Sequence, residues 1–448
     1  MKRLKSVVIF TIIFILLFLP ISTVLATDID KSDYNPDNLE TNSPSVLLMD
    51  ANTGKILYSK NAFERQFPAS TTKIMTAILT LENCKLSDVV TVSHNAIFSI
   101  PVGYSHASLQ EGEELTVEQL LNVLLIPSAN DAAVALAEHI AGSVEAFAEM
   151  MNNKAKEIGC LDTHFVNPNG VHNDEHYSTA YDLALMGRYA MQFDDIMRIA
   201  TVSQYTLPKT NKYDKEDRIF NSTNGLITKN GNYYYPNATG LKTGYTDKSG
   251  YCIVATASKS NVNLLEVVLG SDSIEERYED CTKLFDYGFE NYSYKNLVTA
   301  NSVVDTIEVE GATRETKSLN VLSKDGIDVL LKNNVNTYNL SPTISINSDL
   351  KAPIAENAVI GTLSYEIDGE VYSTDLLAAN AVTSSNFETI VFRVLLIFLI
   401  LYLLVVILKK INKPKDNSNS KSFKHKKPKR VKSKKGGRYK FTQINDFL

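Results

Sequence analysis

Two long apolar stretches lie near the two ends of the chain. Residues 7–19 are almost entirely apolar, follow three basic residues and precede small residues suited to cleavage, which is the arrangement of an export signal. Residues 390–408 are apolar except for Arg393, and as a helix they would span about 28 Å, close to the thickness of a hydrocarbon core. The pattern predicts a signal peptide at 1–26 and a transmembrane helix at 390–408.

Helical and strand patterns alternate in the first part of the intervening chain. Apolar residues recur at helical spacing over 74–79, 117–126 and 132–140. The run Tyr251-Cys-Ile-Val-Ala-Thr-Ala257 is apolar enough for a mostly buried strand. Together these patterns predict an α/β domain with a helical subdomain over residues 27–290.

The segment from 296 to 378 is built differently. It contains short runs in which apolar and polar residues alternate, separated by turn residues, such as Thr306-Ile-Glu-Val-Glu310 and Val359-Ile-Gly-Thr-Leu-Ser364. This pattern predicts a small all-β domain at 296–378. Residues 378–388 are expected to link it to the membrane helix.

The net charge of −6 averages two unlike parts of the chain. Residues 409–448 carry 15 Lys and Arg against Asp416 and Asp446, whereas the remainder is acidic. Because basic flanks stay on the cytoplasmic side of a membrane, we expect a cytoplasmic tail at 409–448 and the folded domains outside. The tail is expected to contact anionic lipid head groups. No aromatic platform accompanies its charge, so nucleic acid is not an expected partner.

Candidate chemistry begins with Ser70-Thr-Thr-Lys73, where Ser70 is predicted to open the buried helix. Backbone N–H groups of a first helical turn could stabilise charge on an acyl oxygen. Lys73 follows on the same face, and an amine in apolar surroundings could accept the Ser70 proton near neutral pH. Alone the pattern is weak, because an N-cap serine followed by a solvated lysine also fits it.

A second motif, Ser128-Ala-Asn130, lies in a tight loop between two predicted helices. Such a loop can hold a hydroxyl as a proton relay and an amide as a ligand for substrate or lysine. The alternative is that Ser128 or Asn130 only caps the second helix.

A third motif, Lys242-Thr-Gly244, comes just before or on a predicted strand. A glycine at a sheet edge lets another backbone approach closely, so an extended peptide could pair there as an added strand. Lys242 would add a positive charge, and Thr243 a hydroxyl, for a carboxylate.

The ordered triple resembles the penicillin-binding D-alanyl-D-alanine carboxypeptidases, serine enzymes with these three motifs. Further similar segments are Phe67-Pro-Ala-Ser-Thr-Thr-Lys-Ile-Met-Thr76, Asn130-Asp-Ala-Ala133, His176-Tyr-Ser-Thr-Ala-Tyr-Asp-Leu-Ala184 and Leu284-Phe-Asp-Tyr-Gly-Phe289. The resemblance covers roughly residues 40–290 and implies a β-lactamase/transpeptidase-like fold: an antiparallel sheet with flanking helices and a helical subdomain. It also implies that the all-β domain is a spacer between the catalytic domain and the membrane.

The resemblance assigns roles to the motif residues. Ser70 would be the acylated nucleophile and Lys73 its base. The backbone N–H groups of Ser70 and Tyr245 would form the oxyanion hole. Ser128 and Asn130 would complete the proton network. Lys242 would contribute electrostatics, and Lys242, Thr243 and Gly244 would contact the substrate. Arg277 would bind the terminal carboxylate, and the alternative is that Arg277 is a solvated residue of a helix.

The implied reaction is release of the terminal D-alanine from peptidoglycan stem peptides through an acyl-enzyme, without a metal or organic cofactor. β-Lactams would stall it at the ester. The same site could act as a D,D-endopeptidase on cross-links. A membrane-anchored receptor of β-lactams or stem peptides that signals through the basic tail, and a structural cell-wall protein with a degenerate site, are the hypotheses from other classes.

Three further features narrow these hypotheses. No E-x-x-L-N stretch lies between Asn130 and Lys242, which argues against a β-lactamase of the class that uses its glutamate for deacylation. His172, Asp174 and His176 cluster in a predicted loop rather than on a rigid helix, so a metal site is not expected. The cysteines permit three complete pairings or four free thiols, and none is assigned a catalytic role: Cys84, Cys160, Cys252 and Cys281.

Overall fold

The computed structural model of the chain describes residues 31–412. The predicted signal peptide at 1–26 and nearly all of the predicted tail therefore lie outside the described residues.

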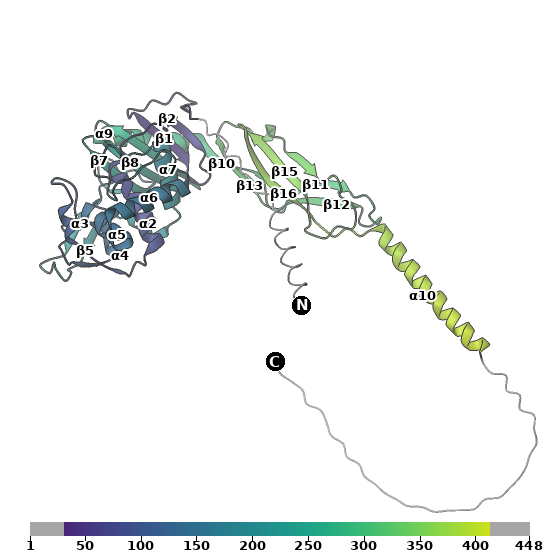
Figure 1. Cartoon of the computed structure of the whole chain (residues 1–448). Coiled ribbons are helices and arrows are strands. Elements are labelled where there is room, and N and C mark those ends of the chain that lie inside the picture. The colour runs from purple at the N-terminus through teal and green to yellow at the C-terminus, as the bar shows by residue number, and fades with distance from the viewer. Residues whose placement is uncertain (1–30, 413–448) are drawn as a thin grey trace, which may run out of the picture. The chain divides into compact units, whose positions relative to one another are not determined.

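A five-stranded antiparallel sheet organises the first part of the chain (Figure 1). Its strand order is β2-β1-β9-β8-β7, which leaves β7 at an edge. The strands are β1 (Ser45–Asp50), β2 (Ile56–Lys60), β7 (Ala238–Thr246), β8 (Gly250–Lys259) and β9 (Val262–Ser271).

Both faces of this sheet are buried. Alternate residues of a strand point to opposite faces, and so Leu47 and Met49 belong to one core cluster whereas Val46 and Leu48 belong to another. Burial on both faces removes the need for polar residues, which explains why β8 is readable in the sequence as an apolar run.

Helices cover each face. The first core cluster receives side chains from α2 (Lys73–Asn83), α4 (Val117–Leu125), α5 (Asn130–Ala141), α6 (Val144–Ile158) and α7 (Ala180–Ala190). On the other face, α9 (Ile274–Asn291) packs against β8 and β9. Shorter elements are α3 (His94–Phe98), α8 (Asp194–Ala200), the 3₁₀ helices η1 (Ala69–Thr72) and η2 (Gly225–Ile227), and two hairpins, β3 (Val89–Thr91) with β4 (Glu114–Thr116) and β5 (Gln204–Leu207) with β6 (Arg218–Asn221).

Strands dominate the next part of the chain. β10 (Tyr292–Val298) pairs with β13 (Ile327–Lys332), so strand structure begins four residues before the predicted position 296. A five-stranded sheet has the order β11-β12-β16-β15-β14. Its strands are β11 (Val303–Glu308), β12 (Ser318–Ser323), β14 (Thr343–Ile346), β15 (Val359–Ile367) and β16 (Glu370–Ala378), with the 3₁₀ helix η3 (Thr337–Asn339) before β14.

The predicted linker at 378–388 is wrong. Val382 forms a bridge with Ile354, Ser384 forms one with Ala312, and helix α10 (Ser385–Ile411) starts at the next residue.

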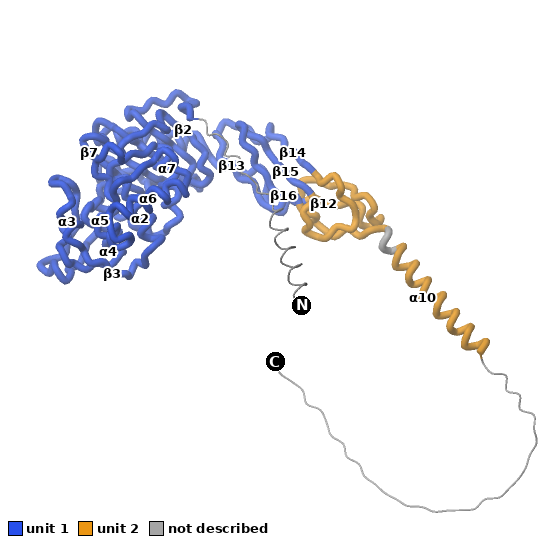
Figure 2. The backbone as a smooth tube through the Cα atoms, in the orientation of Figure 1, with its two compact units in different colours: residues 1–302, 322–345, 361–376 blue, residues 303–321, 346–360, 377–448 orange. Residues whose placement is uncertain are grey.

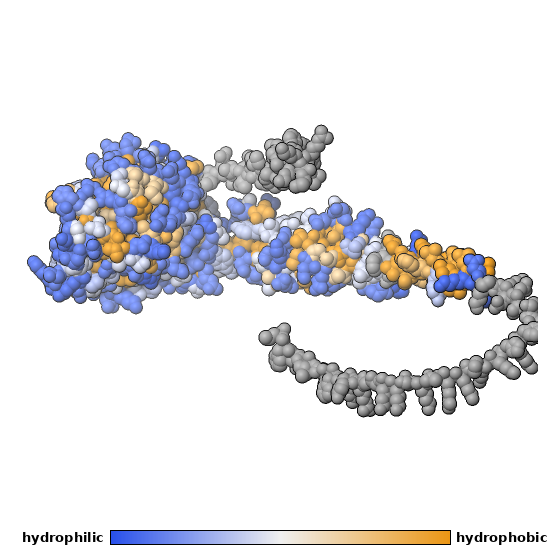
Figure 3. Space-filling view, turned by 60° about the horizontal axis from the view of Figure 1, so that its bottom comes forward, coloured by the Kyte–Doolittle hydropathy of each residue, from blue (hydrophilic) through white to orange (hydrophobic). Residues whose placement is uncertain are grey.

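Helix α10 is long and apolar enough to cross a membrane over Thr389–Ile411. Its apolar side chains are exposed rather than packed into a core (Figure 3). The membrane helix predicted at 390–408 lies within it.

The chain divides into two compact units (Figure 2). Of the described residues, the first unit comprises 31–302, 322–345 and 361–376, and the second comprises 303–321, 346–360 and 377–412. The three sequence motifs all lie in the first unit.

Candidate active site

Ser70 lies in a short 3₁₀ turn just before a buried helix. The sequence predicted that Ser70 opens the helix, but η1 occupies 69–72 and α2 starts at Lys73. Ala69 has a φ of +47°, a left-handed conformation that is unusual for a residue with a Cβ atom. Ser70 caps neither element, since the N-cap residues are Pro68 and Thr72.

The Lys73 amine is held among three oxygen atoms. Its Nζ lies 2.8 Å from Ser70 Oγ, 2.8 Å from Asn130 Oδ1 and 2.7 Å from the carbonyl oxygen of Asn169. The side chain is fully buried. Burial, followed by the nearby charge of Lys242, lowers the pKa of Lys73 well below its usual value. Such an amine is suited to accept a proton from Ser70.

The second motif lies at the junction of α4 and α5. Ser128 has a φ of +68°, and within residues 31–412 its buried Oγ has no hydrogen-bond partner. Asn130 starts α5 but its side chain caps nothing. Instead, its Oδ1 accepts from Lys73 and its Nδ2 donates to the Ser105 carbonyl at 2.7 Å. The helix-cap alternative for this motif is therefore not what the structure shows.

The third motif lies on the edge strand β7. Thr243 and Gly244 line a cavity, whereas Lys242 is buried beside it with Nζ donating to the Thr243 carbonyl at 3.0 Å. Burial, and then the charge of Arg277, lower the pKa of Lys242 to about 7. Thr243 Oγ1 lies 2.6 Å from Thr223 Oγ1.

Two glycines let separate segments approach the nucleophile's turn. A Cβ atom on Gly244 would lie 2.9 Å from Ser70 N, and one on Gly170 would lie 1.8 Å from the Ala69 carbonyl oxygen. The backbone that Gly244 accommodates is thus the turn that carries Ser70. This packing explains how β7 and η1, far apart in sequence, meet at one site.

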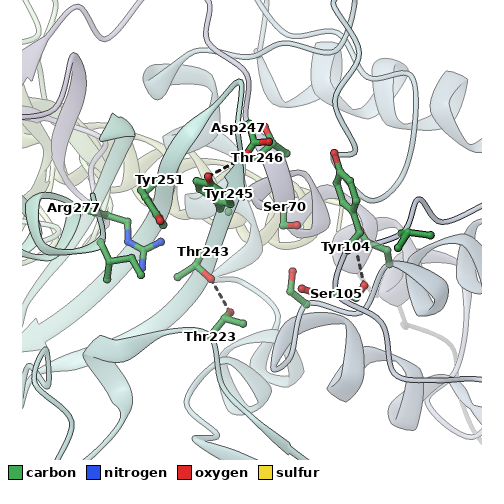
Figure 4. A pocket seen from close by; sticks show the side chains of 16 residues that line it. Ser70, Tyr104, Ser105, Thr223, Thr243, Tyr245, Thr246, Asp247, Tyr251 and Arg277 are labelled. Carbon is green, nitrogen blue, oxygen red and sulfur yellow. Dashed lines mark hydrogen bonds between the residues drawn. The ribbon is translucent and has the colours of Figure 1, made fainter. Parts of the chain in front are cut away.

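One cavity of about 480 Å³ brings the motifs together (Figure 4). Its lining includes most of the residues assigned from sequence, namely Ser70, Ser128, Asn130, Thr243, Gly244, Tyr245 and Arg277. Lys73 and Lys242 are buried behind this surface. Figure 4 shows Thr243 and Arg277 on one side of Ser70, and Tyr104 on the other.

Arg277 projects from α9 into the cavity lining and is 5% exposed. Its guanidinium lies 4.3 Å from the ring centre of Tyr278 and 5.6 Å from that of Tyr251. Its Nη1 donates to the Cys252 carbonyl at 3.5 Å, and within the described residues its buried Nε has no partner. The solvated alternative for Arg277 is wrong, because the guanidinium is buried at the cavity.

Sequence reasoning missed several residues of the cavity. Tyr104 and Ser105 come from the loop after α3, Thr223 from the segment after β6, and Asp247 and Tyr251 from the β7–β8 hairpin. Secondary structure is predicted from the regular spacing of apolar residues, and loops lack such spacing. The sequence around Tyr104, Ser105 and Thr223 therefore does not indicate that they belong to the site. Asp247 and Tyr251 are close enough to the third motif to be candidates by position.

Asp131 anchors the loop that carries Tyr104 and Ser105. Its buried carboxylate accepts hydrogen bonds from Ala107 N at 2.9 Å and from Leu109 N at 3.1 Å. Burial raises the pKa of this carboxyl, against the effect of these backbone donors. Arg218 holds the same loop by donating to the carbonyls of residues 107 and 108, at 3.2 and 3.1 Å.

The histidine cluster serves the packing behind Ser70. His176 is buried, its Nδ1 accepts from Val166 N at 3.2 Å, and its Nε2 lies 2.8 Å from Thr72 Oγ1. Burial lowers the pKa of His176 to about 3, so the ring is neutral and Nε2 carries the proton. His172 instead pairs with Asp174 at 3.3 Å. In the described part of the chain, no three His, Cys, Asp or Glu side chains gather as a metal site would require.

All four cysteines, which the sequence left open, are free thiols in the structure. Cys84 is half-buried and the other three are buried.

Each of the two folded parts of the chain matches a known protein family. Residues 31–273 match the family described as D-alanyl-D-alanine carboxypeptidase, and residues 292–384 match the C-terminal domain of penicillin-binding protein 5. The chain is 37% identical over 341 residues to the D-alanyl-D-alanine carboxypeptidase DacF of Bacillus subtilis (strain 168), covering 75% of this chain and 84% of the relative. It is 30% identical over 376 residues to DacA of Escherichia coli (strain K12), covering 82% and 90%.

A solved structure of penicillin-binding protein 5 from Haemophilus influenzae superposes with a TM-score of 0.63 at 28% identity, covering 78% of this chain and all of that one. The fold is thus a transpeptidase-like catalytic domain followed by a β domain and an apolar helix, as the sequence predicted. The chain belongs to the D-alanyl-D-alanine carboxypeptidase family of serine-type peptidases.

Proposed function

We propose that in this carboxypeptidase Ser70 is the nucleophile and Lys73 is its general base. One observation carries the proposal: a fully buried amine, with its pKa lowered, lies 2.8 Å from the Ser70 hydroxyl. A serine hydroxyl is a weak nucleophile unless a base takes its proton, and a neutral amine at this distance is within reach to do so.

Asn130 and Ser128 complete the proton network. Asn130 orients the Lys73 amine through its Oδ1 atom. The Ser128 hydroxyl lines the cavity and has no partner among residues 31–412, so it is free to pass a proton to the leaving amine. Its left-handed backbone conformation costs roughly 1–3 kcal/mol, a strain that structures tend to keep at functional sites.

The end of the cavity near Arg277 receives the terminal carboxylate. The buried Nε of Arg277 has no partner among the residues that the structure describes, Thr243 contributes its hydroxyl, and Lys242 adds charge from behind. Charge-assisted hydrogen bonds of this kind suit a carboxylate. A peptide with a free C-terminus is therefore held with its last residue beside Thr243.

The open edge of β7 supports the remainder of the substrate. An extended peptide adds to such an edge through its main chain, and this places its carbonyl near the N–H groups of Ser70 and Tyr245. These two groups form the oxyanion hole, since both residues line the cavity around the reacting atoms.

The reaction has two steps. Ser70 Oγ attacks the carbonyl carbon between the last two D-alanines while its proton passes to Lys73; the C–N bond then breaks, and D-alanine leaves after its amine takes up a proton. Water hydrolyses the ester and Ser70 regains its proton. A β-lactam forms the same ester, but its amine stays attached and slows the second step.

We further infer that α10 anchors the enzyme in the membrane, with the catalytic domain on the extracytoplasmic side. Residues 389–411 have the length and composition of a membrane span, and Lys409 and Lys410 occupy the last turn of the helix. The basic residues that follow favour the cytoplasmic side, where anionic lipid head groups are their partners.

D-alanine release by the full-length protein in detergent tests the site assignment. The substrate is a stem peptide ending in D-Ala-D-Ala, the comparison is Ser70→Ala, and labelled penicillin titrates the active sites. We expect both release and labelling to disappear in Ser70→Ala. Labelling that persists in Ser70→Ala would contradict Ser70 as the nucleophile, and Ser70-dependent labelling without release would favour an endopeptidase or a receptor.

A further inference from the structure

The cavity carries one charge of each sign at its surface. Among its lining residues, Arg277 is the cation and Asp247 is the carboxylate. Figure 4 shows Tyr251 and Tyr245 between them, and the rings of these two tyrosines are tilted against each other with their centres 4.4 Å apart. A ligand that fits this surface presents a negative group at one end and a positive group at the other.

The direction of β7 sets which part of a substrate meets Asp247. In the proposed binding mode the terminal carboxylate is beside Thr243 and the reacting carbonyl beside Gly244, so the preceding residues run past Tyr245 toward Asp247. Asp247 is three positions after Gly244, in the turn that follows β7, and three positions of extended chain span about 10 Å. A long side chain on the residue just before the two D-alanines reaches that far.

Asp247 is held in position for such a contact. The Tyr245 hydroxyl donates to Asp247 Oδ1 at 2.9 Å, and within residues 31–412 its Oδ2 has no partner. The turn itself is built by other residues: Thr246 N donates to Ser249 Oγ at 2.9 Å, and Ser249 N donates to Thr246 Oγ1 at 3.0 Å. The Asp247 carboxylate is thus not used in shaping the hairpin.

The neighbouring charge does not neutralise Asp247. Lys248 follows it in the turn and is exposed, but it does not line the cavity. No ion pair joins the two side chains in the described part of the chain. The carboxylate is therefore open to a cation supplied by the substrate.

We propose that Asp247 selects stem peptides in which the residue before D-Ala-D-Ala carries a free side-chain amine. This inference rests on the proposed function, because it uses the binding direction along β7. The amine forms an ion pair with Asp247 Oδ2, while the terminal carboxylate is bound near Arg277. Asp247 acts on recognition and takes no part in the proton transfers.

The test compares two peptides that differ only in that amine. One is Nα-acetyl-L-lysyl-D-alanyl-D-alanine, with a free ε-amine, and the other is its Nα,Nε-diacetyl form. The readout is the ratio of kcat/KM values for the two peptides within each full-length protein, so general damage to the enzyme cancels. The proteins are wild type, Asp247→Asn and the control Lys248→Gln.

We expect wild type to prefer the free amine by about two- to five-fold, the range of a partly exposed ion pair, and Asp247→Asn to bring the ratio close to one. Lys248→Gln should keep the preference. An unchanged ratio in Asp247→Asn would overturn the proposal. The proposal would also be overturned if the ratio rose in Lys248→Gln by as much as it fell in Asp247→Asn. The preference would then come from the net charge near the cavity and not from contact with Asp247.

Failure of the proposed function gives a different result. If wild type released D-alanine from neither peptide, the carboxypeptidase assignment would be contradicted. Competition of each peptide against penicillin labelling would then still report the Asp247 contact: a free-amine preference lost in Asp247→Asn supports it, and equal competition by the two peptides overturns it.

Discussion

At the scale of single residues, the site depends on two lysine amines that are kept out of water. Lys73 lies among three oxygen atoms, and Lys242 lies behind the cavity wall. Burial lowers both pKa values; the charge of Lys242 adds to the lowering at Lys73, and the charge of Arg277 adds to the lowering at Lys242. In the proposed mechanism the two residues need opposite states, because Lys73 is proposed to act as a neutral base and Lys242 as a positive charge.

A pH profile follows from these opposite needs. We expect the rate of acylation by penicillin to rise with pH as Lys73 loses its proton, and to fall above about 7 as Lys242 loses its charge. Arginine stays charged over this range, so Lys242→Arg should move the descending limb to higher pH. The measurement is the pH dependence of the acylation rate constant. A descending limb at the same pH in both proteins would show that another group causes it.

Gly244 is the residue where backbone proximity matters most. A Cβ atom there would lie 2.9 Å from Ser70 N, so Gly244→Ala has to push β7 away from the nucleophile's turn. A displacement of about 1 Å costs roughly 100-fold in rate. We expect acylation by penicillin to slow by about that factor, as measured in a stopped reaction with labelled drug. Gly326→Ala controls for the added methyl group, because Gly326, like Gly244, has no left-handed φ and a Cβ atom there would meet nothing closer than 3.3 Å; equal rates in Gly244→Ala and wild type would be the contrary outcome.

At the scale of elements, the sequence predicted those helices and strands whose apolar residues follow a regular pattern. Helices α2, α4 and α5 and strand β8 were predictable because their buried residues recur at regular spacing. The start of α2 was misplaced by three residues, since η1 is a 3₁₀ turn with no pattern of its own. The three motifs supply five of the sixteen residues that line the cavity. The rest come from β7, β8, α9 and loops, and only tertiary packing brings loop residues such as Tyr104 and Thr223 to the same cavity as Ser70.

The anchored loop after α3 gives a prediction at this scale. Asp131→Ala removes a buried carboxylate and leaves the N–H groups of Ala107 and Leu109 without acceptors. Each buried unsatisfied donor costs about 1–3 kcal/mol, so for the two donors we expect the free energy of unfolding to fall by roughly 2–6 kcal/mol. Denaturant unfolding measures it.

Asp174→Ala is the matched control, because its side chain is 91% exposed and surface changes usually stay within about 0.5 kcal/mol. Similar losses in the two variants would contradict the anchoring role of Asp131. A loosened loop should also raise KM for the peptide, since Tyr104 and Ser105 line the cavity.

At the scale of the whole molecule, chemistry and attachment lie in different parts of the chain. The three motifs all precede residue 273, whereas the apolar helix begins at 385. We therefore expect the proposed anchor to be separable from catalysis by truncation; the apolar run near the end of the chain and the three motifs predict this partition. The paired residues 382 and 384 could not be foreseen, because isolated bridges leave no repeating pattern.

A truncated chain tests the separation. A variant that ends at Ser384 loses α10 and all that follows, so we expect it to leave the membrane fraction while it still releases D-alanine from a soluble stem peptide. Fractionation of cells with penicillin labelling locates the chain, and a D-alanine release assay on the soluble fraction measures its activity. Retention of the truncated chain in the membrane fraction would show that α10 is not the anchor.

The close packing at Gly244 also bears on the handedness of the substrate. In an extended peptide bound by its main chain, exchange of a D-residue for its mirror image leaves the hydrogen-bonding groups in place and moves the methyl group to the opposite side. Around Ser70 these two sides are unequal: one is the packed junction of β7 and η1, and the other is the open cavity. We therefore expect the discrimination between mirror-image dipeptides to arise from crowding at this junction, without any additional polar contact.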